Sequence, residues 1–160
     1  MQTAFCEANA LNRLVFMRNN AFRVGLTDGE NLVICGSRGW INPTDSAWRA
    51  AADEAIFRRE LGRLKLSLTA AESLLTDQSV LLVALHYPPF NRQAQPNELT
   101  DLLEACSVDL CLYGHVHGLP GSRLPEGVFN AIEYINVASD HLSFVPRRIW
   151  QGNGGLLDGF

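Results

Sequence analysis

The sequence predicts an α/β fold in one domain. Residues Ser79 to Leu85 form an uninterrupted apolar run of β-forming residues, which is typical of a strand covered on both faces. Between Phe57 and Leu75, apolar residues recur at spacings of three and four, which indicates a long amphipathic helix. A second helix pattern separates the first strand from another ending at Tyr113, so this half of the chain contains a β-α-β unit.

Short elements are expected in the N-terminal part of the chain. Residues Thr3 to Arg13 are compatible with a short helix. The apolar runs Leu14 to Met17 and Ala21 to Leu26 flank an Asn-Asn turn signal, which predicts a small hairpin. A third run, Asn31 to Cys35, follows an Asp-Gly turn. We therefore expect three strands in close succession before the long helix.

Helix-start signals and apolar runs predict the remaining elements. The long helix is expected to begin near Pro43, and a capping-box pattern at Thr69 indicates a possible break into two pieces. The second helix is expected to begin at Asn97. Two further strands are expected over about Ala131 to Ala138 and Ser143 to Ile149. We expect residues 1–150 to form the domain and the glycine-rich residues 151–160 to form a flexible tail.

Charge and composition exclude several classes of protein. The formal net charge is -4, and the basic residues form only isolated pairs, so no nucleic-acid partner is expected. No apolar stretch approaches the roughly 20 residues that cross a bilayer, and no signal peptide is recognisable, so we expect a cytoplasmic protein without membrane contact. The cysteines form no C-x-x-C pair and are interpreted as core thiols: Cys6, Cys35, Cys106 and Cys111.

Three of the four histidines follow two consecutive predicted core strands. His86 comes directly after the first strand, and His115 and His117 follow the second in the segment GHVHG. Ligands of open α/β sheets bind beyond the carboxyl ends of the strands, so these side chains are expected at one site. Alternate residues of extended chain share a face, and neutral imidazole binds Zn, Mn and Fe. The pattern predicts a transition-metal site.

Other residues near these motifs are weaker candidates. Arg38, in a glycine-flanked loop after a strand, is a candidate contact for a substrate phosphate or a solvated charge. His141 is expected to be structural or exposed, with Asp140 at most orienting a ligand. Three aromatic residues could line a pocket, although packing is their default role: Trp40, Tyr87 and Phe90.

A strand-end histidine followed by a G-H-x-H motif resembles the calcineurin-like metallophosphoesterase superfamily. The segments CGSRGW, LHYPPF and LYGHVHG are similar to a group of predicted bacterial phosphohydrolases within it, and the resemblance covers Phe16 to Ile149. It implies an α/β fold with a layered β-sandwich flanked by helices and two divalent ions (Mn, Fe or Zn). It implies that His86 and His115 bind one ion and His117 the other. The implied reaction is hydrolysis of a phosphomonoester or phosphodiester.

The chain departs from this superfamily at its N-terminal end. The D-x-H, G-D and G-N-H-D/E motifs, which supply the other ligands and a catalytic histidine, do not occur before Leu14. We therefore expect the C-terminal half of such a domain, with its N-terminal portion missing and its metal site incomplete. Such a chain is expected to be inactive alone and could self-associate through an exposed sheet edge.

Two other classes of function remain open. The first alternative is a non-catalytic protein-interaction module, or an inactive fragment, that keeps the fold without the activity. The second is another histidine-metal hydrolase, which fits less well: the H-x-H-x-D-H pattern of metallo-β-lactamases would require Asp at Leu119 and His at Pro120.

Overall fold

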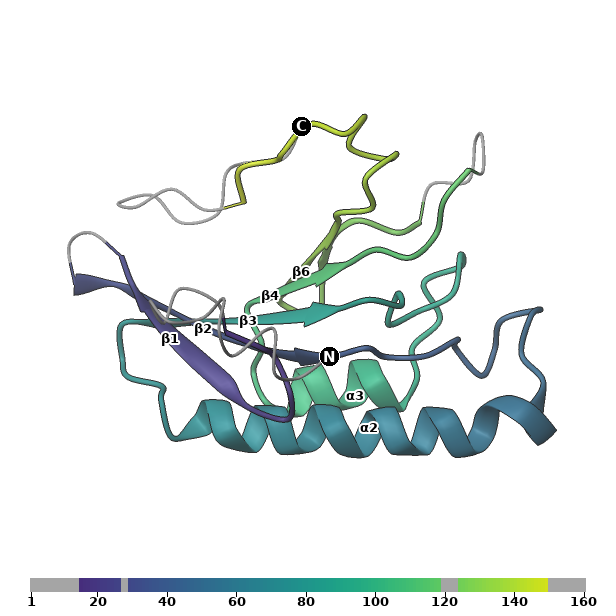
Figure 1. Cartoon of the computed structure of the whole chain (residues 1–160), viewed down its shortest axis with the longest axis horizontal. Coiled ribbons are helices and arrows are strands. Elements are labelled where there is room, and N and C mark those ends of the chain that lie inside the picture. Colours follow the sequence, from purple (N-terminus) through teal and green to yellow (C-terminus); the bar gives the residue numbers. More distant parts are fainter. Residues whose placement is uncertain (1–14, 27–28, 119–123, 150–160) are drawn as a thin grey trace, which may run out of the picture.

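Six strands and two helices make up the described part of the chain in a mixed α/β arrangement (Figure 1). The computed structural model describes residues 15–26, 29–118 and 124–149. The expected N-terminal helix, Cys6 and the glycine-rich tail lie outside these ranges. The elements are β1 (Ala21–Gly25), β2 (Asn31–Ser37), α2 (Ala50–Glu72), β3 (Ser79–Leu85), α3 (Glu98–Ala105), β4 (Leu110–Tyr113), β5 (Gly127–Phe129) and β6 (Ile132–Asn136).

The strands form one sheet in the order β1-β2-β3-β4-β6-β5. The four central strands are parallel, and β1 and β5 pair antiparallel at the two edges. Strand β3 lies between β2 and β4, with Leu82 opposite Leu110, which explains why its sequence is apolar on both faces. The predicted β-α-β unit, formed by β3, α3 and β4, is therefore confirmed.

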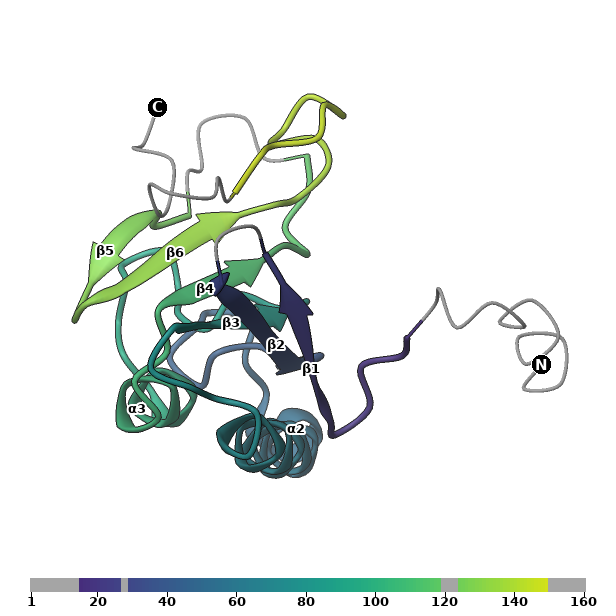
Figure 2. The same ribbon diagram turned by 90° about the vertical axis from the view of Figure 1, so that its left-hand side faces the viewer.

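Both helices cover the same face of the sheet (Figures 1 and 2). Apolar side chains from α2 and α3 pack there against alternate residues of the central strands, and burial of this surface supplies the main stabilisation of the fold. The fully buried members of this core include Phe57, Leu64, Leu99, Leu103, Val33, Val83 and Tyr113.

The opposite face of the sheet is also apolar. Leu32, Leu82, Leu110 and Ile135 form a second cluster there, and further apolar residues that flank it are only partly buried. Within the described ranges, neither helix covers this face (Figure 2). The sheet therefore presents a second apolar surface to whatever lies beside it.

Helix α2 begins later than predicted. Its first residue is Ala50 rather than a residue near Pro43. Side chains hold the preceding segment in turns: Asn42 Oδ1 accepts hydrogen bonds from the Thr44 amide and hydroxyl, and Asp45 Oδ1 accepts one from the Ala47 amide. The helix then runs without a break to Glu72, which confirms the single long helix, and the alternative break near Thr69 does not occur.

Two further sequence predictions are wrong. The hairpin consists of β1 and β2 rather than the runs on either side of the asparagine turn, and residues 15–20 form no strand. The strand expected over Ser143 to Ile149 is absent, because Ser143 and Phe144 have positive φ angles of 51° and 59° and turn the chain. The sequence analysis also missed the three-residue strand β5.

A close approach between β2 and β3 precedes the histidines. A Cβ atom at Gly36 would lie 2.0 Å from the carbonyl oxygen of Ala84, so only glycine allows the two strands to meet here.

Among the described residues, no helix has the length and apolar character required to cross a membrane.

Candidate metal site

The parallel sheet brings His86 and His115 together. Strand β3 ends one residue before His86, and the neighbouring strand β4 ends two residues before His115. The Gly114 amide donates a hydrogen bond of 3.2 Å to the His86 carbonyl oxygen, which ties the two strand ends to each other. The parallel order of the two strands therefore brings these two imidazoles together.

The two imidazole rings present nitrogen atoms to each other. Nδ1 of His115 lies 2.9 Å from Nε2 of His86, and the ring planes are inclined by 73°. Two nitrogen ligands about 2.1 Å from one ion, at angles of about 90–110°, would lie about 3.0–3.4 Å apart. The pair therefore fits two positions around a transition-metal ion, and without an ion it can share one proton.

The backbone at His115 is held in a tight turn. Its φ angle is 74°, and the Val116 amide donates a hydrogen bond of 3.0 Å to the Gly114 carbonyl oxygen across it. Such a φ angle costs a non-glycine residue about 1–3 kcal/mol.

Burial lowers the pKa of His115, and the neighbouring His86 and His117 lower it further. The neutral imidazole, which is the form that binds metals, is thereby favoured.

His117 belongs to a different group of side chains. Its Nδ1 atom lies 2.8 Å from Oδ1 of Asp140, and Oδ2 of the same carboxylate accepts a hydrogen bond of 2.7 Å from the Gly118 amide. The Gly118 amide and the His117 imidazole lower the pKa of Asp140 to about 2. A carboxylate bonded to Nδ1 of a histidine fixes the ring and leaves Nε2 available to a ligand.

The three predicted histidines do not form one cluster. Within the described ranges, no group of three or more His, Cys, Asp or Glu side chains is arranged to hold a metal ion. His86 and His115 supply two nitrogen atoms at one point, and His117 with Asp140 forms a separate exposed pair. His141, expected to be structural or exposed, has its Nε2 atom 3.0 Å from Oε2 of Glu126.

Aromatic rings support the histidine pair from one side. The Tyr87 ring lies against His115, with centroids 3.8 Å apart and planes inclined by 34°, and Trp40 packs against Tyr87 at 4.9 Å. The amides of His86 and Tyr87 both donate hydrogen bonds to the Arg38 carbonyl oxygen, at 3.1 and 2.9 Å. The loop after β2 therefore fixes the backbone of His86.

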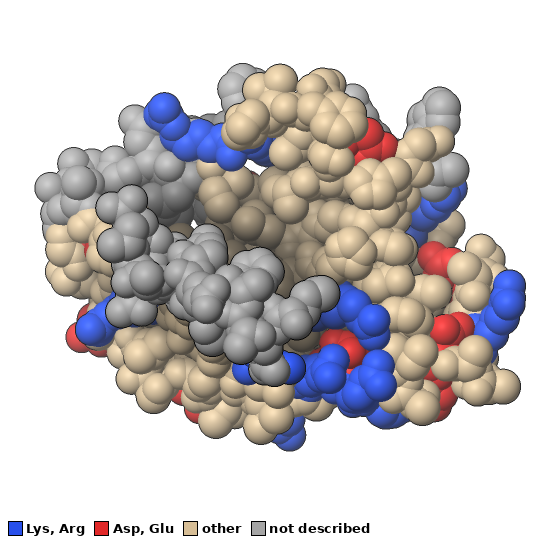
Figure 3. All heavy atoms as spheres, viewed as in Figure 1, with Lys and Arg blue, Asp and Glu red and all other residues tan. Residues whose placement is uncertain are grey.

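The Arg38 side chain has a partner outside the histidine site. Its Nη2 atom lies 3.2 Å from Oε1 of Glu60 on α2, and its guanidinium lies 4.5 Å from the Trp40 ring centroid. Arg59 and Arg63 also approach Oε1 of Glu60, at 3.5 and 2.9 Å. Basic side chains gather on this face over α2 (Figure 3). The guanidinium of Arg38 thus neutralises a buried carboxylate, and its role as a phosphate contact stays a prediction.

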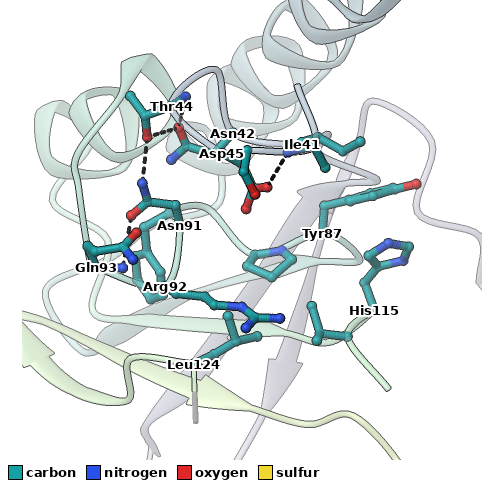
Figure 4. Close-up of a pocket in the computed structure, with 15 residues that line it drawn as sticks. Ile41, Asn42, Thr44, Asp45, Tyr87, Asn91, Arg92, Gln93, His115 and Leu124 are labelled. Atoms are coloured by element: carbon teal, nitrogen blue, oxygen red, sulfur yellow. Dashed lines mark hydrogen bonds between the residues drawn. The ribbon is translucent and has the colours of Figure 1, made fainter. Parts of the chain in front are cut away.

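A pocket of about 690 Å³ opens beside His115 (Figure 4). One wall is the segment between β2 and α2, and another is the segment between β3 and α3. Tyr87 and Phe90 line it, whereas Trp40 packs against the Tyr87 ring and is not among the lining residues. Sequence analysis missed Arg92, which also lines the pocket. Its position in a loop directly after the strand-end motif was the only available signal.

The chain matches no protein-family model, and a search of curated proteins finds no similar sequence either. The function is therefore argued from the side chains and the motifs.

Proposed function

We propose that this chain supplies the histidine ligands of a metal-dependent phosphoester hydrolase of the calcineurin-like type. The single observation that supports this most directly is the convergence of His86 Nε2 and His115 Nδ1, 2.9 Å apart at the carboxyl ends of two parallel strands. Resemblance of the LHYPPF and LYGHVHG segments to that superfamily supports the choice of reaction. The six-stranded mixed sheet is compatible with one half of the layered sandwich that the proposal requires.

His86 and His115 would hold one divalent ion, and His117 would contribute to a second. Mn, Fe and Zn all accept imidazole nitrogen. When bound, such ions supply Lewis-acid activation of the phosphoryl group and of the attacking water. Asp140 fixes the His117 ring through Nδ1, and Tyr87 packs against the His115 ring, so the chain restricts the orientation of both imidazoles before any ion arrives.

The described residues do not complete such a site. A catalytic zinc ion normally has three protein ligands, and here the converging pair supplies two. We propose that the remaining ligands come from residues outside the described ranges or from a second polypeptide. The chain on its own would then bind metal weakly and hydrolyse phosphate esters poorly.

Metal titration of single variants tests the assignment. We expect Co²⁺ or Zn²⁺ binding by the wild-type chain to weaken strongly in the His86→Ala and His115→Ala variants, because each removes one of two converging ligands. His141→Ala is the matched control, since His141 pairs with Glu126 instead. Isothermal titration and the visible spectrum of bound Co²⁺ report the affinity. Equal affinity of the wild type and the His115→Ala variant would disprove the assignment.

A further inference from the structure

Both apolar and polar side chains line the pocket beside His115. Its volume of about 690 Å³ lies within the range of small-molecule sites. Phe90 and Leu124 in its lining are buried, and Tyr87 lies on the same side of the pocket as His115 (Figure 4). A flat apolar group of a ligand would find contacts on several sides here.

Hydrogen bonds hold the two walls of the pocket together. Asn91 Nδ2 donates to the Thr44 hydroxyl at 2.8 Å, and the same hydroxyl donates to Asn42 Oδ1 at 2.7 Å. Asn42 Nδ2 donates in turn to the carbonyl oxygen of Gln95 at 3.4 Å. Asn42 and Asn91 are each only 3% exposed. These amides are occupied in bracing the loops, so they shape the pocket rather than contact a ligand.

Arg92 contributes a positively charged side chain to the lining of this pocket. Its side chain extends across the cavity, with the guanidinium toward the side that bears His115 (Figure 4). No hydrogen bond or ion pair joins this guanidinium to any other residue in the described ranges. A guanidinium offers five donors arranged to fit a phosphate or carboxylate, and none of them is used by another side chain or backbone group in the described ranges.

Asp45 places one negative charge in the same lining. Its Oδ1 atom accepts a hydrogen bond from the Ala47 amide, and its carboxylate points into the pocket (Figure 4). Arg92 attracts each negative charge of a ligand and Asp45 repels each of them, so Asp45 offsets part of the advantage that Arg92 gives to a ligand with two charges over a ligand with one. A phosphodiester carries one negative charge. A phosphomonoester carries about 1.5 to 2 negative charges at neutral pH.

We propose that this pocket binds the organic part of a phosphodiester, with a flat apolar group against Tyr87 and Phe90 and the phosphate paired with Arg92. Asp45 then disfavours the dianionic monoester more than the monoanionic diester. This inference rests on the proposed function for its choice of phosphate as the anion. It names the substrate class of the same site.

Binding measured without metal tests this proposal separately from the metal assignment. Methyl phenyl phosphate, a monoanion, and phenyl phosphate, a dianion at about pH 8, are titrated in EDTA into the ¹⁵N-labelled chain. We expect methyl phenyl phosphate to shift the amide signals of Tyr87, Arg92 and Val116. The Arg92→Gln variant should bind it about tenfold more weakly or worse, because a charge-assisted hydrogen bond is lost.

Two further variants complete the test. Asp45→Asn keeps the oxygen that accepts from Ala47 but removes the charge, so it should strengthen the binding of phenyl phosphate more than that of methyl phenyl phosphate. Arg23→Gln on edge strand β1 removes an arginine outside the pocket lining and should leave both affinities unchanged. The proposal is overturned if neither ligand shifts these signals, if Arg92→Gln binds like the wild type, or if Asp45→Asn does not strengthen the binding of phenyl phosphate more than that of methyl phenyl phosphate. Since metal is absent throughout, failure of the metal titrations leaves these outcomes unaffected.

Discussion

The His117 imidazole and the Asp140 carboxylate lie 2.8 Å apart, although 22 residues separate them in the chain. Their contact joins the loop after β4 to the segment after β6, and these two strands are parallel neighbours in the sheet. The same carboxylate accepts hydrogen bonds from the amides of Gly118 and His141. A single side chain thus sets the direction of the exposed histidine ring.

Replacing Asp140 with Asn should weaken any metal binding that involves His117. Loss of a carboxylate that orients a ligating histidine typically costs about 10- to 100-fold in metal affinity. Titration of a second equivalent of Zn²⁺ or Mn²⁺ measures the effect. Glu126→Gln provides the matched control, because Glu126 bonds to His141 instead. An unchanged second equivalent in Asp140→Asn would show that His117 takes no part in binding.

The sequence predicted the centre of the sheet and the histidine pair, because both follow from strong local patterns. An apolar run such as β3 is buried on both faces in almost any arrangement, and parallel neighbours bring their carboxyl ends to one edge. The start of α2 and the turn at Ser143 could not be predicted, because side-chain hydrogen bonds from Asn42 and Asp45 and positive φ angles decide them. Arg92 and the Asp140 contact depend on tertiary structure and carry no periodic signal.

The chain alone, supplied with excess Mn²⁺ or Zn²⁺, should show little or no phosphodiester hydrolysis. His86 and His115 provide two ligands to one ion, one fewer than a catalytic zinc site normally has. The G-N-H-D/E motif, which carries the catalytic histidine of the resembled superfamily, does not occur before Leu14, and such a general acid typically contributes about 10²- to 10⁴-fold. Turnover of an aryl phosphodiester measures this, with His115→Ala as the control. Metal-dependent turnover that the control abolishes would show that other residues complete the site.

The chain should self-associate in solution. Its second sheet face is apolar and not covered by the described helices, and its edge strands are exposed, with Val24 on β1 and Val128 on β5 at 45% and 69%. Analytical ultracentrifugation over a range of concentrations should detect oligomers. A Val24→Lys or Val128→Lys variant should dissociate them if the corresponding edge pairs. A monomer at every concentration, with cooperative thermal unfolding, would contradict this expectation.

The arginines around Glu60 should be able to replace one another as partners of its buried carboxylate. Its carboxylate is 1% exposed, and Oε1 has three guanidinium neighbours whose side chains are about half exposed. Arg38→Ala or Arg63→Ala alone should therefore lower the free energy of unfolding by about 1 kcal/mol or less. The double variant should cost about 3 kcal/mol, more than the sum, because the buried charge loses most of its compensation. Urea denaturation measures these values, with Arg23→Ala as the control. Strict additivity would show that the arginines act independently.

Cys35 should resist alkylation in the folded chain. Burial raises its pKa to about 12, so almost no thiolate forms at about pH 8. Cys106 is only partly buried and should react first when iodoacetamide is added to a Cys6→Ser background. Because the folded pKa is raised, this thiol favours the folded state below the unfolded pKa of about 9, and the contribution is lost as the pH rises toward 12. Mass spectrometry with and without urea measures the labelling. Equal rates for the two cysteines would refute the prediction.

The hydrogen bonds among Asn42, Thr44 and Asn91 also determine how the pocket can move. They connect loops that lie 47 residues apart in the chain, one on each wall. Neither loop can open without breaking the bonds that hold the other, so the two should unfold locally as one cooperative unit. Amide hydrogen exchange at Thr44 and Gln95 would then occur at a common opening rate. A ligand entering this pocket would need to order little of the chain and would lose correspondingly little affinity to entropy.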